Sequence, residues 1–120
     1  LARQRSWSSK DVHASAYRGI HILYLLGFAE AVDPMSTTKE VVEKIIKPRT
    51  LANKCRFADQ LLKTNQKAAV GRATVFGSHC WNGRFRDLVA ALAHVLPNDA
   101  YVWLDIFAVN QHRGTAEQNE

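Results

Sequence analysis

The second half of the chain carries a strand, helix, strand pattern, and this pattern constrains the possible folds more than any other feature. Residues 73–76 are a short apolar run that predicts a strand, and residues 84–96 repeat apolar side chains every three or four positions, as an amphipathic helix does. Residues 101–107 are rich in β-branched and aromatic side chains and predict a second strand. The connection length suits a right-handed unit in which the two strands lie side by side and parallel, with the helix crossing between them.

The residues before this unit predict an arm and a helical segment. Residues 1–13 are rich in Ser and charge and lack apolar periodicity, which is typical of a linker, whereas residues 14–70 are expected to be mainly helical. Apolar side chains cover several faces of residues 14–32, so we expect a helix that is buried on most sides or docked to a protein partner. The run from Ile20 to Leu26 also fits a strand.

Two further helices are expected in the middle of the chain. Thr37 and Glu40 have the spacing of a capping box, so a helix should begin there, and Pro48 should end it. A short helix is expected to follow around residues 57–62.

The middle of the chain is also its basic part. Residues 36–70 hold eight Lys or Arg against three acids, in a chain of net charge +5. The basic run from Lys44 to Lys67 has two interpretations, either a solvated helix surface or a weak nucleic-acid-binding face.

Small and polar residues follow both predicted strands, where ligands of open α/β sheets usually bind. The order of these residues resembles the heterokaryon-incompatibility domain, whose members often show Ser-Tyr-x-Trp-Gly, a helix, and then Trp-Ile-Asp-x-x-x-x-Asn-Gln. The residues that match this pattern are Ser78, Trp81, Trp103, Asp105, Asn110 and Gln111. His79 stands in place of the usual Tyr, and Asn82-Gly83 stands where a single Gly is common.

The resemblance covers residues 73–120 and implies a flavodoxin-like fold, because this family is regarded as a relative of TIR domains. Those domains act in self-recognition, immune signalling and cell death, and some of them cleave NAD with a Glu in the helix after the second strand. Glu117, twelve positions beyond Asp105, matches that catalytic position best. Its carboxylate would stabilise the positive charge that develops as nicotinamide leaves. The ligand-binding residues that the resemblance implies are Ser78, His79, Trp81, Asp105, Asn110 and Gln111.

Each of these residues also has a plainer interpretation. Asp, Asn and Gln side chains commonly hydrogen-bond the backbone of turns, so Asp105, Asn110 and Gln111 fit a structural role. Trp81 and Trp103 belong to a residue type that is more often buried than ligand-binding. The spacing of the His and Cys residues predicts neither a Cys-His nucleophile nor a metal site.

We therefore expect an α/β fold in which residues 71–120 begin a TIR-like domain. This part would be an incomplete, flavodoxin-like parallel β-α-β unit preceded by the helical segment. A doubly wound domain needs about four or five strands, and the pattern supplies only two. The remaining strands should come from sequence outside this chain or from another chain.

The function expected from this combination is signalling or self-recognition by protein association. NAD would be a substrate rather than a cofactor, and whether the domain is an enzyme stays open. The main alternative is a catalytically silent subunit that binds a larger assembly through residues 14–32, and a weaker alternative is a nucleic-acid-binding accessory protein. The cytoplasm is the expected compartment, since the sequence shows no secretory signal, no apolar run long enough for a membrane span, and no CxxC spacing between Cys55 and Cys80.

Overall fold

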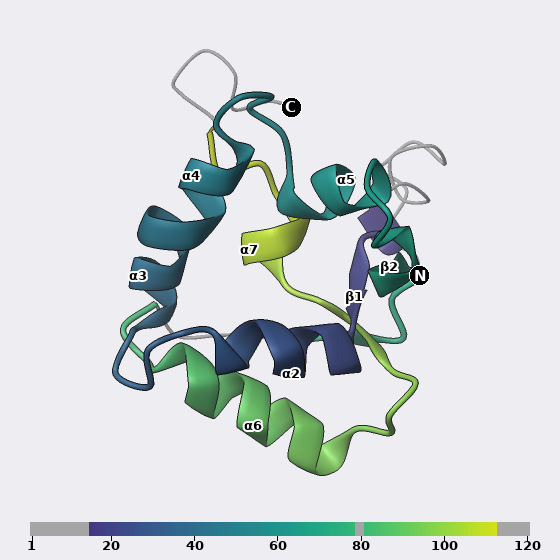
Figure 1. The fold of residues 1–120 in the computed structure, drawn as a ribbon. Coiled ribbons are helices and arrows are strands. Elements are labelled where there is room, and N and C mark those ends of the chain that lie inside the picture. Colours follow the sequence, from purple (N-terminus) through teal and green to yellow (C-terminus); the bar gives the residue numbers. More distant parts are fainter. Residues whose placement is uncertain (1–14, 79–80, 113–120) are drawn as a thin grey trace, which may run out of the picture.

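The structure, a computed structural model, describes residues 15–78 and 81–112 (Figure 1). Its centre is a four-stranded mixed sheet with the strand order β2-β1-β4-β3. The strands are β1 (Gly19–His21), β2 (Val70–Gly71), β3 (Val75–Phe76) and β4 (Tyr101–Trp103). The helices are α2 (Ile22–Glu30), α3 (Thr38–Val41), the π-helical turn η2 (Val42–Ile46), α4 (Lys47–Thr50), α5 (Phe57–Leu62), the 3₁₀ turn η3 (Lys67–Ala69), α6 (Phe85–Val95) and α7 (Asp105–Ala108). The chain therefore has an α/β fold.

The predicted parallel unit is confirmed. β3 and β4 lie side by side and parallel, with Val75 opposite Val102 and Phe76 opposite Trp103. Helix α6 connects the two strands, as the apolar repeat predicts.

The second strand of this unit is shorter than predicted, because β4 ends at Trp103 and α7 begins at Asp105. The three side chains Ile106, Phe107 and Ala108 are all buried. A strand would point alternate side chains to opposite faces of the sheet, whereas a helical turn can direct neighbouring side chains into the same core. The prediction of a strand up to Phe107 is therefore wrong.

The prediction of a single helix over residues 14–32 is also wrong, and the strand alternative for the run from Ile20 to Leu26 holds only for Ile20 and His21. Gly19–His21 is the strand β1, which lies inside the sheet and pairs antiparallel with both β2 and β4, and the helix α2 starts only at Ile22. A Cβ atom on Gly19 would lie 2.8 Å from the Cα atom of Ala73, so the crossing chain fits only above a glycine. His21 then caps the N-terminus of α2, since its Nδ1 atom accepts a hydrogen bond from the Leu23 amide at 3.1 Å.

β1 thus lies within the segment 14–70 that was expected to be helical, and β2 begins at the last residue of that segment, Val70. They join β3 and β4 in one sheet, so the two predicted strands do not lie alone. We expected all strands other than the two of the parallel unit to come from outside this chain, and this pairing corrects that expectation.

The leucines of α2 differ in their burial. Leu25 is fully buried, and Leu26 is partly buried against the core, whereas 52% of Leu23 is exposed. The prediction of a helix buried on most sides therefore holds for two of the three leucines. None of the helices in the described residues combines the length and the apolar character that crossing a bilayer requires.

One helical rod runs without a break from Thr38 to Thr50. Its predicted capping box is confirmed, because the Thr37 hydroxyl accepts from the Glu40 amide at 3.1 Å and the Glu40 carboxylate accepts from the Thr37 amide at 2.9 Å. The prediction that Pro48 ends this helix is wrong. Pro48 follows the wider π-helical turn η2, and such a turn eases the clash between a proline ring and the preceding carbonyl groups.

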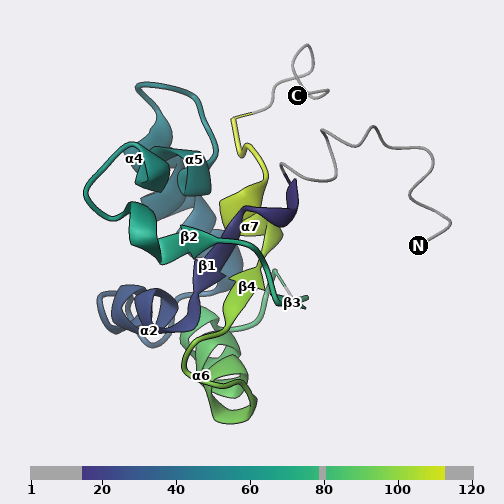
Figure 2. The same cartoon turned by 90° about the vertical axis from the view of Figure 1, so that its right-hand side faces the viewer.

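The two faces of the sheet have different surroundings. Ile20 and Val102, which pair across β1 and β4, are fully buried under the helices. The opposite face carries Tyr101, Trp103 and Phe76, and Figure 2 shows β1 and β4 from this side with the helices behind or beside them. We call it the open face of the sheet.

An aromatic cluster fills the space between the helices. The Phe28 ring on α2 lies 5.7 Å from Phe57 on α5, 5.7 Å from Phe85 on α6 and 5.3 Å from Phe107 on α7. The ring planes are steeply inclined to one another, which is the favourable edge-to-face arrangement. Four helices therefore meet at one buried side chain.

Replacing Phe107 by Ala should lower the free energy of unfolding by about 3–5 kcal/mol, because the change leaves a cavity in this cluster. Phe76→Ala is the matched control, since Phe76 is 67% exposed and its removal should cost less than about 1.5 kcal/mol. Urea unfolding followed by tryptophan fluorescence measures both values. Similar losses in the two variants would contradict the assignment of the core.

Candidate functional site

The ends of β3 and β4 remain together beyond the last paired residues. The Gly77 amide donates to the Trp103 carbonyl at 2.9 Å, and a Cβ atom on Gly77 would lie 2.9 Å from the Leu104 side chain. Ser78, which is exposed, directly follows Gly77, and Asp105, which starts α7, follows Trp103 after one residue, Leu104. Ser78 and Asp105 therefore both follow the carboxyl ends of the parallel strands β3 and β4.

The two amide side chains after α7 bind backbone atoms. Gln111 Nε2 donates to the Asp105 carbonyl at 3.1 Å and to the Val109 carbonyl at 3.0 Å. Asn110 Nδ2 donates to the Lys54 carbonyl at 2.9 Å, and Asn110 Oδ1 accepts from the His112 amide at 2.8 Å. The contacts of Asn110 attach the chain after α7 to the turn that follows α4. Both Asn110 and Gln111 thus have the structural role that was one of their two interpretations from the sequence.

His112 completes this attachment through a buried hydroxyl group. Its Nε2 atom lies 2.6 Å from Thr50 Oγ1, and the Thr50 hydroxyl lies 2.8 Å from the Ile46 carbonyl. A hydroxyl has one proton, and the carbonyl of Ile46 can only accept, so Thr50 donates to Ile46 and accepts from the Nε2–H group of His112. This arrangement fits a neutral imidazole that carries its proton on Nε2.

The surroundings of His112 oppose its protonation. Burial, followed by the charges of Lys47 and Lys54, lowers the pKa of His112 below its ordinary value. A histidine whose pKa is lower in the folded chain than in the unfolded chain stabilises the fold in its neutral form. This contribution is complete above the unfolded-state pKa of about 6.5, and it is lost as the pH falls through the lower folded-state pKa.

Gln111 and His112 also border a shallow hollow of about 450 Å³. Its other lining residues are Glu43, Lys47, Pro48 and Leu51. The hollow lies beside the C-terminal half of the 38–50 rod, and its lining residue Gln111 is hydrogen-bonded to the Asp105 carbonyl.

Trp81 lies at the other end of that rod. The Trp81 carbonyl accepts from the Lys39 amide at 3.0 Å, and the Gly83 carbonyl accepts from the Thr38 amide at 2.9 Å. From Lys39 to Thr50 the rod rises about 1.5 Å per residue, or roughly 17 Å in all. In Figure 1 the chain before α6 passes the lower end of α3, whereas the chain after α7 reaches the upper end of α4. The structure therefore does not bring Trp81 together with Asn110, Gln111 and His112 in one pocket mouth.

The remaining residues of the predicted site are His79 and Glu117. Both lie outside the described residues, as does Cys80. Within residues 15–78 and 81–112, no group of three or more His, Cys, Asp and Glu side chains is arranged to hold a metal ion.

The open face carries an aromatic pair that the sequence analysis did not single out. The Phe76 ring lies 5.5 Å from the Trp103 ring at an interplanar angle of 32°. Trp103 is half-buried, and its Nε1–H group has no hydrogen-bond partner among the described residues. Phe76 stays 67% exposed on an edge strand. Side chains alternate between the two faces of β3 and β4, which places Phe76 and Trp103 on the same face. The sequence pattern does not show which face of the sheet the helices leave uncovered.

The basic run of the middle segment is partly neutralised by acids of the same chain. Lys44 lies 3.8 Å from Glu40, Lys47 lies 3.3 Å from Glu43, and both Arg56 and Arg18 contact Asp59, at 3.3 and 3.0 Å. Contacts of this kind are typical of solvated helix surfaces, and each contributes little to stability when exposed.

The combined variant Lys47→Gln and Lys54→Gln should raise the pKa of His112, because it removes two positive charges that disfavour the imidazolium form. The rise should be partial, since burial is the larger cause. A titration of the His112 ring protons by NMR measures it. The matched control is Lys63→Gln with Lys67→Gln, which should leave this pKa unchanged. An unchanged pKa of His112 in the Lys47→Gln and Lys54→Gln variant would contradict the effect of these two charges on the imidazole.

No family model, curated protein or solved structure matches this chain. What the chain does therefore has to be inferred from the chemistry and geometry of its own residues.

Proposed function

We propose that the chain is a TIR-like or heterokaryon-incompatibility-like module that works by protein association, and that it associates with a second copy through the open face beside β3. The observation that carries this proposal is the Phe76–Trp103 pair, in which Phe76 on the edge strand β3 is 67% exposed and Trp103 on the neighbouring strand β4 is half-buried. Aromatic side chains are enriched at the centres of protein interfaces.

The position of β3 supports the same surface. β3 is the last strand in the sheet order, so its outer edge pairs with no other strand of the described residues. Natural proteins usually cover such an edge or make it polar, because unpaired backbone groups attract another strand. A second copy that packs on Phe76 would cover both the edge and the aromatic pair.

The parallel unit supports the TIR-like part of the proposal. β3, α6 and β4 follow one another as in a flavodoxin-like half, and Trp103, Asp105, Asn110 and Gln111 keep the order of the resembling motif. The antiparallel strand β1 departs from an all-parallel sheet, so the proposed likeness rests on the parallel unit.

The side chains after α7 favour an associating module over a catalytic one. The amide groups of Asn110 and Gln111 are occupied by the backbone contacts that hold the turn. Groups used in this way are less available to orient a substrate. We therefore place association first and NAD cleavage second.

Phe76→Ser should weaken self-association by about 2 kcal/mol, or roughly thirtyfold, because it removes the aromatic centre of the proposed interface. Val95→Ser is the matched control, since Val95 is 72% exposed but lies at the end of α6. Sedimentation equilibrium of the chain over a range of concentrations measures the dissociation constants. A wild-type chain that stays monomeric at every concentration, or an equal effect of both substitutions, would overturn the proposed surface.

For NAD cleavage, Glu117→Gln should reduce nicotinamide release by the full-length protein at least about a hundredfold, since the amide has the shape of the carboxylate but not its charge. Glu120→Gln is the control and should keep its activity. If the unmodified protein releases no nicotinamide, the module is a silent association subunit.

A further inference from the structure

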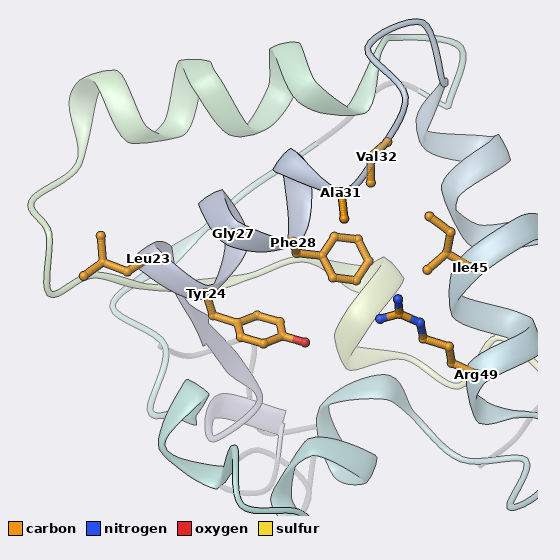
Figure 3. Close-up of a pocket in the computed structure, with 8 residues that line it drawn as sticks. All are labelled: Leu23, Tyr24, Gly27, Phe28, Ala31, Val32, Ile45 and Arg49. Carbon is orange, nitrogen blue, oxygen red and sulfur yellow. The ribbon is translucent and has the colours of Figure 1, made fainter.

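A groove lies between α2 and the helical rod of residues 38–50, away from the open face of the sheet (Figure 3). Its volume is about 400 Å³, within the range of pockets that bind small organic molecules. The lining residues are Leu23, Tyr24, Gly27, Phe28, Ala31, Val32, Ile45 and Arg49. Six of these eight residues carry only apolar side chains or none, so the groove has an apolar floor with two polar groups.

The hollow exists partly because Gly27 has no side chain. A Cβ atom on Gly27 would meet no atom within 4 Å, so neither packing nor a turn requires a glycine at this position. In the interior of α2 a glycine costs about 0.5–1 kcal/mol relative to alanine. The chain thus keeps an open space above α2 at the expense of helix stability.

The first polar group of the groove is the guanidinium of Arg49. It lies 5.8 Å from the centre of the Phe28 ring and points into the groove (Figure 3). Among the described residues no carboxylate lies within ion-pair distance of Arg49, in contrast to Arg18 and Arg56, which both contact Asp59. Arg49 is itself exposed to solvent, so its guanidinium combines contact with the Phe28 ring with a charge that no described carboxylate neutralises.

The second polar group is the hydroxyl of Tyr24, whose ring enters the groove from α2 on the same side as Arg49 (Figure 3). Burial raises the pKa of Tyr24, and the charge of Arg49 acts in the opposite direction. The phenol is consequently protonated at neutral pH and can donate a hydrogen bond beside the guanidinium.

The wall opposite α2 is formed around the π-helical turn. Ile45 belongs to η2, and Arg49 follows in α4. Inserted π-helical turns occur often at functional sites, because they rotate the following side chains out of the ordinary helical register. Here the turn precedes the residue that carries the charge.

We propose that this groove binds a small organic carboxylate with an apolar body, such as an aromatic or short-chain aliphatic acid. The apolar body lies above Gly27 and packs against the exposed Leu23 and Ala31. The carboxylate accepts charge-assisted hydrogen bonds from Arg49 and a hydrogen bond from Tyr24. The site is independent of the association surface, because it requires neither Phe76 nor a second copy of the chain.

The test measures binding of 3-phenylpropionate and octanoate to the whole chain by ligand-observed NMR and calorimetry, with 3-phenylpropanamide as the uncharged probe. The acids should bind at least about tenfold more tightly than the amide. Arg49→Gln should weaken binding of the acids by about ten- to a hundredfold, and Tyr24→Phe by less, because only one neutral donor is lost.

Two control variants locate the site. Gly27→Leu fills the groove and should abolish binding, while its urea midpoint should not fall, since the new side chain meets open space. Arg72→Gln should leave binding unchanged, because Arg72 also lies over an aromatic ring, 5.6 Å from the Tyr17 ring centre, but not in the groove.

Three results would overturn the proposal. These are no binding of either acid at millimolar concentration, equal affinity for acid and amide, and unchanged binding in the Gly27→Leu variant. Binding of an acidic amphipathic peptide without binding of the small acids would also overturn it, and it would identify the groove as a protein-docking site.

Discussion

The edge-to-face packing of Phe28 against three other phenylalanine rings is the interaction on which the arrangement of the helices depends. Phe57, Phe85 and Phe107 reach this ring from α5, α6 and α7, so one side chain of α2 joins segments that are far apart in the sequence. Each of these rings buries a large apolar area, which is the dominant favourable contribution to folding. The sheet contributes Ile20 and Val102 to the same core.

The two surfaces to which we assign functions stand in different relations to this core. The groove borders this core, since Phe28 lines the groove and also packs against the other three phenylalanine rings. Its shape is therefore held by the most strongly packed part of the molecule, which favours a preformed binding site. The Phe76–Trp103 pair lies on the opposite, open side of the sheet and depends on the core only through the pairing of β3 with β4.

The polar residues after α7 show how a motif can serve structure. Asn110 and Gln111 bind carbonyl groups of the backbone, and His112 binds the buried hydroxyl of Thr50. The contacts of Asn110 and His112 attach the chain after α7 to the end of the 38–50 rod and to the turn that follows it. The same residue types in the same order would suit a ligand site, and only the position of their partners distinguishes the two roles.

The sequence by itself determined the elements whose signals are local. The capping box of Thr37 and Glu40, the amphipathic helix α6 and the parallel pairing of β3 with β4 all follow from spacing and composition within short stretches. Tertiary structure alone decided that Gly19–His21 is a strand inside the sheet, because that choice depends on β2 and β4 and on the close passage of Ala73. It also placed the loop of Trp81 and the residues after α7 at opposite ends of one helical rod, since a local pattern gives the period of a segment but not the partner against which it packs.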